Sequence, residues 1–354
     1  MSNIYNIIPK YIKNLTGYQS ARKIGGNGKI WLNANESPYL SKLSISFKKL
    51  NRYPHFQPEK LLLAYSLYSK IPKKNILITR GADEGIDLLI RVFCERNKDS
   101  IITIPPTYGM YDIIAKIAGI QNKKIFMLWE KNISINRIIS NIKNVKIIFI
   151  CRPNNPTGHL INKKTIYSIL KLSKNKFFIV IDEAYIDFCI TDNLSGWIKE
   201  FKNLIILRTL SKAFGLAGIR CGFILASSKI INIISKIIAP YPIPYPTYKI
   251  AYSFFSPKNI NLLKKHIITI NFNRFWLFHK LKKIKLIQEV FTSYANFILI
   301  KTLYVKKIFF VLQRNGIIVR DQHNVPMLRG CLRISIGTHS ECKKIIETLK
   351  NLNS

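Results

Sequence analysis

The chain has 354 residues, 48% hydrophobic and 21% charged, a balance that indicates a folded globular protein and excludes a disordered one. Its 56 Lys and Arg against 18 Asp and Glu give a formal net charge of +38, which makes a nucleic-acid-binding protein one alternative. The basic residues are spread along the whole sequence, without a dense block or a basic tail. Lys, Ile, Asn, Phe and Tyr, whose codons are AT-rich, are also abundant together. We therefore favour solvated surface lysines over a nucleic-acid partner.

The six cysteines form no C-x-x-C pair, and several lie inside apolar runs. This pattern predicts reduced, buried thiols in a cytoplasmic protein rather than disulfides or a zinc site. The histidines show no H-E-x-x-H or other ligand spacing, so no metal is expected. The N-terminal stretch lacks the apolar core of a signal peptide, and no apolar run approaches the roughly 20 residues needed to cross a bilayer.

Residues 1–28 show little periodicity and are expected to form an N-terminal arm. Beyond them, apolar runs alternate with helical patterns such as the one that follows Gly81 and another over 163–173. The predicted strands span residues 75–79, 100–104, 123–128, 145–151, 177–182, 204–209 and 222–227. Because these strands are continuously apolar, they indicate a sheet covered on both faces. The expected fold of residues 29–245 is an α/β domain with three αβα layers and a mostly parallel sheet.

The pattern changes near residue 240, where "APYPIPYPT" predicts a turn or hinge. Helical segments follow up to about residue 283. Three shorter strands, over 296–301, 316–321 and 331–337, precede a terminal helix. We expect residues 246–354 to form a second, smaller α+β domain.

Residues that could bind a ligand through their side chains or backbone N–H groups follow the predicted strands of the larger domain. They lie at the end of an open α/β sheet where ligands bind. These residues are Gly81, Ala82, Asp83, Glu84, Tyr108, Asn154, Asn155, Asp182, Tyr185, Ser211, Lys212 and Arg220. Each has a simpler explanation when taken alone: an acid that complements a helix dipole, a core tyrosine, a turn asparagine or a solvated lysine. The prediction of a site depends on the whole set.

The set suits a ligand with a phosphate, a ring nitrogen that prefers to be protonated, an acidic ring oxygen and a carbonyl carbon. A helix N-terminus binds phosphate, and Ser211 and Arg220 add a hydroxyl and a fixed cation. Asp182 can hold a pyridinium N–H, Tyr108 can stack on a ring, and Lys212 can attack a carbonyl. These features predict pyridoxal 5′-phosphate as the cofactor. Burial beside other cations would lower the pKa of Lys212 and favour its reactive neutral form.

Ordered motifs along the chain carry a resemblance to a known family. They are "YQSARKIGGNGKIWLNANESP" (18–38), "LNRYP" (50–54), "RGADEGIDLLIRVFCE" (80–95), "PPTYGMY" (105–111), "PNNPTG" (153–158), "IDEAYIDFC" (181–189), "RTLSKAF" (208–214), "AGIRCGF" (217–223), "IAPYP" (238–242), "VRDQ" (319–322) and "CLRISIG" (331–337). In this order they resemble the fold-type I pyridoxal-phosphate-dependent aminotransferases, and most closely the histidinol-phosphate aminotransferase family within them. Two departures, Arg152 and Gly215, replace no residue with a role.

The resemblance implies a role for each matching residue. Lys212, Asp182 and Tyr185 would be the catalytic residues. The cofactor would contact Ala82, Asp83, Tyr108, Asn155, Asp182, Tyr185, Ser211, Lys212 and Arg220, together with Tyr53 of the second subunit in a homodimer. The substrate would contact Tyr18, Asn35, Arg320 and Arg333.

The implied reaction is transamination between L-histidinol phosphate and 2-oxoglutarate, which gives imidazole acetol phosphate and L-glutamate in L-histidine biosynthesis. An arginine such as Arg333 could bind either a carboxylate or a phosphate. Two alternatives within the same fold stay open at this point: an aromatic aminotransferase, and a decarboxylase of a phosphorylated amino acid. No nucleic-acid or membrane partner is expected.

Overall fold

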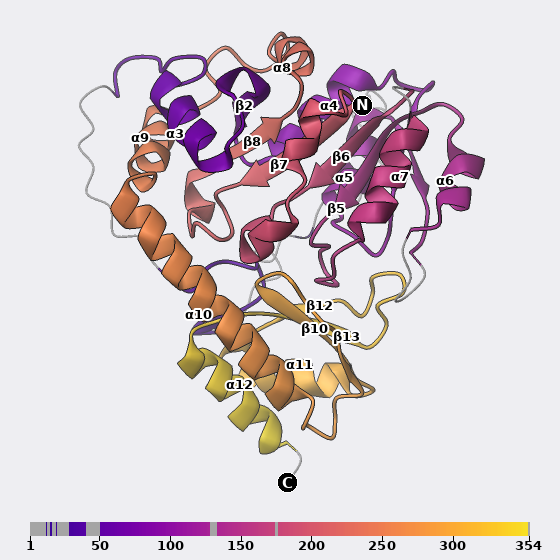
Figure 1. The fold of residues 1–354 in the computed structure, drawn as a ribbon. Helices are drawn as coiled ribbons and strands as arrows, with labels where there is room; N and C mark the ends of the chain where they lie inside the picture. The colour runs from indigo at the N-terminus through magenta and orange to yellow at the C-terminus, as the bar shows by residue number, and fades with distance from the viewer. Residues whose placement is uncertain are drawn as a thin grey trace, which may run out of the picture.

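The computed structural model describes residues 12, 15, 19, 28–39, 50–127, 133–173 and 176–352. A central sheet lies between layers of helices, and a smaller unit built largely from the C-terminal part of the chain lies beside it (Figure 1). Within the described residues, no helix is long and apolar enough to span a membrane.

The central sheet has seven strands in the order β2-β8-β7-β6-β5-β3-β4. The strands are β2 (Ile76–Thr79), β3 (Ser100–Thr103), β4 (Gln121–Lys124), β5 (Val145–Cys151), β6 (Phe178–Asp182), β7 (Leu204–Thr209) and β8 (Gly222–Leu225). β8 is antiparallel to β7 and β2, and the other neighbours pair in parallel. The predicted mostly parallel sheet is therefore confirmed, and its parallel strands end at one common edge.

Helices cover both faces of this sheet because successive strand residues point to opposite sides. On one face, Ile147 and Phe149 pack with side chains of three helices, α4 (Ala82–Phe93), α5 (Met110–Ala118) and α8 (Ser228–Ile234). On the other face, Ile148 and Ile150 pack with α3 (Glu59–Ser69) and α7 (Lys163–Ser173). A short helix, α6 (Ile135–Asn141), and four 3-10 helices complete this unit: η2 (Lys73–Asn75), η3 (Ile186–Asp192), η4 (Ser195–Lys199) and η5 (Ala217–Ile219).

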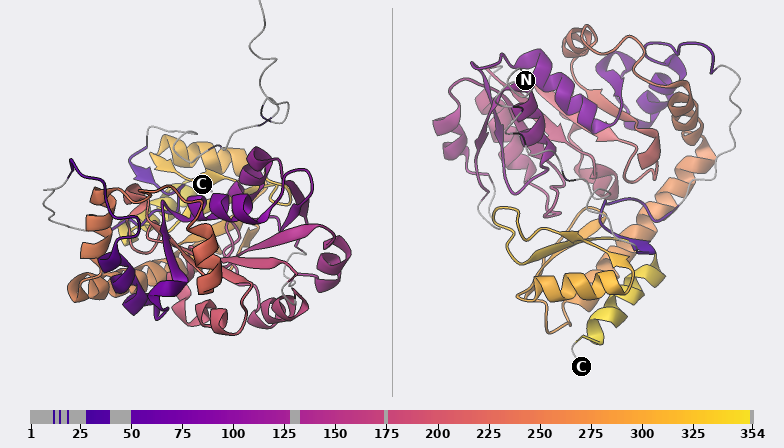
Figure 2. Two further views of the ribbon diagram at one scale, coloured as in Figure 1. Left: turned by 90° about the horizontal axis from the view of Figure 1, so that it is seen from above. Right: turned by 180° about the vertical axis from the view of Figure 1, so that it is seen from behind.

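The smaller unit has an antiparallel sheet in the order β12-β13-β10-β9. Its elements are β9 (Glu289–Val290), β10 (Phe297–Lys301), α11 (Val305–Arg314), β11 (Ile317–Ile318), β12 (Arg320–Asp321), β13 (Cys331–Ser335) and α12 (His339–Lys350). Two helices lead into it, α9 (Tyr245–Phe254) and the long α10 (Pro257–Leu281). Figures 1 and 2 show α10 running along one side of the molecule from the large unit to the small one.

Several element bounds differ from those predicted. The segment predicted as a strand over 316–321 is two short strands, because β11 pairs in parallel with β1 (Ile30–Trp31) while β12 pairs with β13. Helix α3 begins at Glu59, directly after Pro58, because the fixed φ of proline is compatible with the start of a helix. Pro246 likewise lies in the first turn of α9. Most of the predicted arm lies outside the described residues, and the domain boundaries stay predictions.

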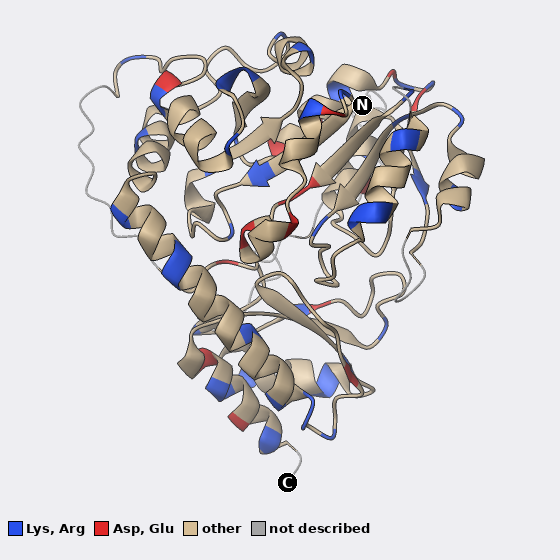
Figure 3. Cartoon of the chain, in the orientation of Figure 1, with Lys and Arg blue, Asp and Glu red and all other residues tan. Residues whose placement is uncertain are grey.

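The positive charge is distributed over the helices and loops of both units (Figure 3). Exposed acidic residues are fewer, and several pair with a nearby lysine, as Glu95 does with Lys98 and Glu200 with Lys171. Such exposed pairs add little stability. This distribution agrees with the interpretation of the lysines as solvated side chains.

Candidate active site

A cluster of hydrogen-bond donors lies where β2 leads into α4. Gly81, the residue before the helix, has φ of 82°, and a Cβ there would lie 2.6 Å from Nη2 of Arg220. Gly222 is equally confined, since its Cβ would lie 2.6 Å from the backbone carbon of Gly81. Nη1 of Arg220 is 3.3 Å from Oγ of Ser211. The helix N-terminus, a guanidinium and a hydroxyl thus form one group of donors that suits a phosphate.

Asp182 lies at the end of β6 and is 3% exposed. Its Oδ2 accepts a hydrogen bond of 2.6 Å from the hydroxyl of Tyr111, and its Oδ1 accepts one of 3.0 Å from the backbone N–H of Ala184. Burial raises the pKa of Asp182 to about 6, although both hydrogen bonds act in the opposite direction. A buried carboxylate of this kind gains most from a cationic or N–H donor partner.

Lys212 follows β7, and its Nζ donates a hydrogen bond of 2.9 Å to the carbonyl oxygen of Ala34. Nζ also lies 5.7 Å from the centre of the Tyr185 ring. Burial lowers the pKa of Lys212 to about 8, and the charge of Arg333 acts in the same direction. The lysine is therefore closer to its neutral, nucleophilic form than an exposed lysine, as the sequence led us to expect.

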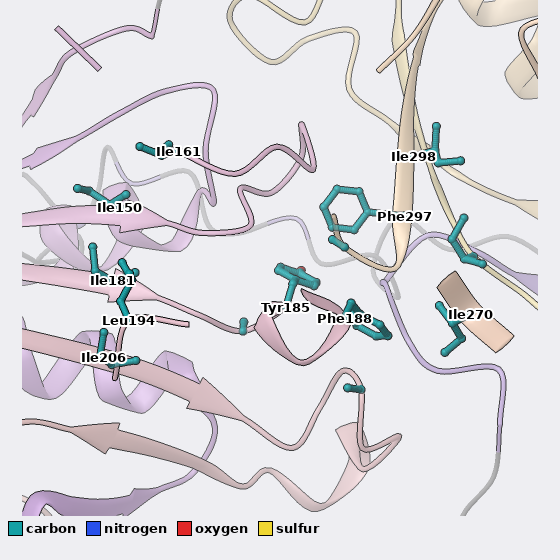
Figure 4. Close-up of a cluster of buried hydrophobic side chains, with 14 of the residues drawn as sticks. Ile150, Ile161, Ile181, Tyr185, Phe188, Leu194, Ile206, Ile270, Phe297 and Ile298 are labelled. Atoms are coloured by element: carbon teal, nitrogen blue, oxygen red, sulfur yellow. The ribbon is translucent and has the colours of Figure 1, made fainter. Parts of the chain in front are cut away.

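The hydroxyl of Tyr185 accepts hydrogen bonds from two amides. Nδ2 of Asn35 is 3.0 Å away and Nδ2 of Asn155 is 3.3 Å away. The Tyr185 ring is held from the other side by Phe297 of β10, at 5.2 Å and nearly perpendicular (Figure 4). The tyrosine therefore stands between the large and small units, in a fixed orientation.

Arg333 of β13 is 7% exposed and extends the same network. Its Nη1 donates to Oδ1 of Asn155 at 2.6 Å, and its Nη2 donates to the carbonyl oxygen of Asn33 at 2.7 Å. Arg320 is its direct partner in the antiparallel register of β12 and β13, so the two side chains leave the sheet on the same face. Nη1 of Arg320 is buried and makes no hydrogen bond to the described residues.

The remaining predicted residues have different surroundings. Tyr108 donates a hydrogen bond of 2.9 Å to Oδ1 of Asp83, and Oδ2 of the same carboxylate lies 3.5 Å from Nη2 of Arg220. Tyr53 is 80% exposed and stacks on the ring of Tyr241 at 4.3 Å, away from the cluster around Lys212. Tyr18 lies outside the described residues.

A hollow of about 370 Å³ opens beside Ser211. Its wall is formed by the glycine-rich loop after Lys212 on one side and by residues 29–38 on the other. Ser211 is therefore the predicted cofactor-binding residue that lines this hollow, whereas Gly81 and Tyr185 are not part of its wall.

The sequence matches the class I and II aminotransferase family over residues 27–349. It is 49% identical to a histidinol-phosphate aminotransferase of Buchnera aphidicola subsp. Melaphis rhois, over 99% of each chain. It is 43% identical to the protein of that name from Yersinia pseudotuberculosis serotype O:3, over 99% of this chain and 92% of the relative. The chain belongs to the histidinol-phosphate aminotransferase family.

Solved structures agree with this family. The histidinol-phosphate aminotransferase of Clostridium acetobutylicum superimposes with a TM-score of 0.83 at 28% identity, over 91% of this chain and 98% of that one. The one from Sinorhizobium meliloti, in complex with pyridoxal 5′-phosphate, has a TM-score of 0.87 at 20% identity and 98% coverage of both. Dependence on pyridoxal 5′-phosphate is a property of the aminotransferase family.

Three contributors to the site were not identified from the sequence. Tyr111 lies in the first turn of α5, and a tyrosine among apolar helix residues usually packs in the core, so its bond to Asp182 was not expected. The carbonyl oxygens of Asn33 and Ala34 hold Arg333 and Lys212. Backbone groups leave no trace in the residue type, so no sequence signal could have revealed them.

Proposed function

We propose that this chain transfers the amino group of L-histidinol phosphate to 2-oxoglutarate, giving imidazole acetol phosphate and L-glutamate, a step of L-histidine biosynthesis. The observation that carries the proposal is the network around Tyr185: Nζ of Lys212 lies over its ring, and its hydroxyl accepts from Asn155, which in turn accepts from Arg333. It occurs in a chain whose full-length relatives bear that activity in their names. The buried thiols and the absence of a membrane-spanning helix within the described residues support placing the enzyme in the cytoplasm.

The donor set fits pyridoxal 5′-phosphate. The N–H groups of Ala82 and Asp83, with Ser211 and Arg220, suit its phosphate, and the glycine at 81 leaves room that a Cβ would fill. Asp182 would pair with the ring nitrogen. Tyr185 and Asn155 would face the ring oxygen, and Tyr108 would stack on the ring. When bound, the cofactor supplies the electron sink that stabilises negative charge on the substrate carbon bearing the amino group.

Lys212 is the residue that would move protons. Its lowered pKa gives the ε-amino group the ability to accept a proton near neutral pH and to return it. The carbonyl of Ala34 and the ring of Tyr185 restrict where Nζ can lie. A lysine held in this way would accept and return the proton from a fixed position beside Tyr185.

Arg333 and Arg320 would bind the anionic ends of the two substrates. One substrate carries a phosphate and the other a carboxylate, and a guanidinium can form paired hydrogen bonds with either. Nη1 of Arg320 is buried without a hydrogen-bond partner among the described residues, so it could donate to a substrate anion, while Nη2 donates to the carbonyl oxygen of Gln19. Asn35 joins this network through Tyr185, and Tyr18 is assigned here from the family resemblance alone.

We further propose a homodimer in which Tyr53 reaches the cofactor phosphate of the second subunit. Its 80% exposed ring, stacked on the half-exposed Tyr241, supports an interface on this surface. Hybrid dimers test it. A Lys212→Ala subunit paired with a Tyr53→Ala subunit should regain activity, because one of the two sites then has both native residues. Hybrids no more active than the two parent variants would show that Tyr53 acts within its own subunit.

The substrate assignment is tested by comparing three amino donors with 2-oxoglutarate as acceptor. We expect kcat/KM for L-histidinol phosphate to exceed that for phenylalanine by more than tenfold, and phosphothreonine to yield no carbon dioxide. Faster turnover of phenylalanine would identify an aromatic aminotransferase, and release of carbon dioxide would identify a decarboxylase. A colourless protein that binds DNA with steep salt dependence would contradict the enzyme assignment itself.

A further inference from the structure

The carboxylate of Asp182 is surrounded by groups that do little to keep it ionised. The ionisable groups that act on it include Asp83 from α4, the adjacent Glu183, the neutral thiol of Cys151 on β5, the hydroxyl of Tyr185 and the hydroxyl of Tyr111 on α5. The two acids oppose its charge, and burial raises its pKa to about 6. The side-chain hydroxyl of Tyr111 is therefore the principal neighbour that favours the ionised form.

Tyr111 is held with little freedom to move. It is 0% exposed, its ring stacks on Phe149 at 4.9 Å and 13°, and the ring of Tyr108 packs against its edge at 5.6 Å. Burial and the nearby Asp182 raise the pKa of Tyr111 far above its usual value. Its hydroxyl consequently acts as a donor throughout the working pH range and never competes with Asp182 for a proton.

The two hydrogen bonds to Asp182 also fix its orientation. Oδ2 is held by Tyr111 and Oδ1 by the N–H of Ala184, so rotation of the carboxylate would break both. Each oxygen of an ionised carboxylate has two acceptor sites, which leaves one free on each oxygen for a ligand. A donor on the adjacent helix thus determines in which direction the free acceptor sites point.

We propose that Tyr111 is a positioning residue: its hydroxyl holds the Asp182 carboxylate ionised and oriented toward the ring nitrogen of the bound cofactor. The proposal rests on the cofactor site proposed above and adds to it a residue three positions beyond Tyr108. It makes the hydroxyl of Tyr111, rather than its aromatic ring, the group that matters for the cofactor.

The test compares two substitutions that each remove one tyrosine–aspartate hydrogen bond from the holoenzyme. Tyr111→Phe removes the bond to Asp182. The matched control Tyr68→Phe removes a bond of 2.8 Å to the buried Asp187, outside the proposed site. Three quantities are measured in each: the dissociation constant of pyridoxal 5′-phosphate, the pH dependence of that constant, and the NMR resonance of a ¹⁵N-labelled ring nitrogen in the bound cofactor.

For Tyr111→Phe we expect the dissociation constant to rise about tenfold, as for the loss of one hydrogen bond to a charged group. The lost bond favoured ionised Asp182, so its loss raises the pKa of that carboxyl. The pH below which cofactor affinity falls, the acid limb of the affinity profile, should therefore rise by about one unit. The ring-nitrogen resonance should move toward that of an unprotonated pyridine. Tyr68→Phe should lower only the melting temperature. If Tyr111→Phe folds poorly, 3-fluorotyrosine at position 111 keeps the bond with a stronger donor, and the acid limb should then move to lower pH.

The outcomes separate this proposal from the cofactor site on which it rests. Unchanged affinity, pH dependence and nitrogen resonance in Tyr111→Phe, with all three altered in Asp182→Asn, would overturn the role of Tyr111 and leave the site intact. An unchanged nitrogen resonance in Asp182→Asn as well would remove the assignment of Asp182 and the proposed cofactor site with it.

Discussion

Arg333 and Asn155 are joined by a hydrogen bond of 2.6 Å although 178 residues separate them in the sequence. The same asparagine donates to the hydroxyl of Tyr185, over whose ring Nζ of Lys212 lies. An anion that binds Arg333 would therefore act on a chain of groups that ends at the reactive lysine. Substrate binding at Arg333, as proposed, would in this way change the protonation of Lys212.

The first prediction concerns that coupling. In the apoenzyme, Arg333→Leu should raise the pKa of Lys212 above about 8, because the positive charge of Arg333 lowers it in the native chain. The rate of covalent capture of pyridoxal 5′-phosphate by the apoenzyme, measured against pH, reports the neutral fraction of the lysine. Its midpoint should move to higher pH in Arg333→Leu and stay in place in the control Arg329→Leu, which changes an exposed arginine. If the midpoint stays at the native pH in Arg333→Leu as well as in Arg329→Leu, the proposed coupling between Arg333 and Lys212 is excluded.

The second prediction separates the two substrates. Arg320→Ala should raise KM for L-histidinol phosphate about tenfold more than KM for L-glutamate, since a doubly charged phosphate loses more than a carboxylate when a guanidinium is removed. Steady-state kinetics with each amino donor measures the difference. Arg314→Ala, on the exposed face of α11, serves as the control. Equal increases for both donors would show that Arg320 does not distinguish the phosphate.

The third prediction concerns the buried ion pair between Arg208 and Glu183, the residue that follows Asp182. Arg208 is buried against Glu183, at 2.7 Å from its Oε2. Arg208→Met should lower the free energy of unfolding by about 3 kcal/mol, because it leaves a buried carboxylate without its partner. The double variant Arg208→Met, Glu183→Gln should recover part of this loss in urea denaturation. Lys98→Met, which breaks a solvent-exposed pair, should leave the urea denaturation curve unchanged.

Much of this arrangement could be predicted from the sequence. Continuous apolar runs identified six strands of the central sheet, whereas β4 is the polar stretch Gln121–Lys124 and shares only two residues with the predicted strand over 123–128. The parallel order placed Asp182, Asn155 and Lys212 at one edge. The pairing of β1 with β11, nearly 290 residues later, could not be predicted, because two-residue strands have no periodicity of their own. The role of Tyr111 was equally hidden, since a tyrosine in an apolar helix face usually packs in the core.

The fourth prediction is a pH dependence of stability. Burial lowers the pKa of His159 to about 4, against 6.5 for an unperturbed histidine. Between these two pH values the unfolded chain binds a proton at His159 and the native chain does not. The contribution of neutral His159 to the free energy of unfolding is therefore complete above pH 6.5 and is lost as the pH falls toward 4. Denaturant unfolding between pH 7 and 4 should show a smaller loss of stability in His159→Gln than in the native chain. His279→Gln, on the exposed side of α10, should follow the native curve, and identical curves for all three proteins would exclude this role for His159.

The central claim is that Lys212 transfers the proton in the amino-group exchange. A single-turnover measurement of the half-reaction with L-histidinol phosphate tests it most directly, with each protein loaded with pyridoxal 5′-phosphate. We predict that Lys212→Ala lowers the rate at least a hundredfold, the least expected for the loss of a general base, while Lys202→Ala at an exposed site leaves it unchanged. A Lys212→Ala rate within tenfold of the native rate would contradict the account.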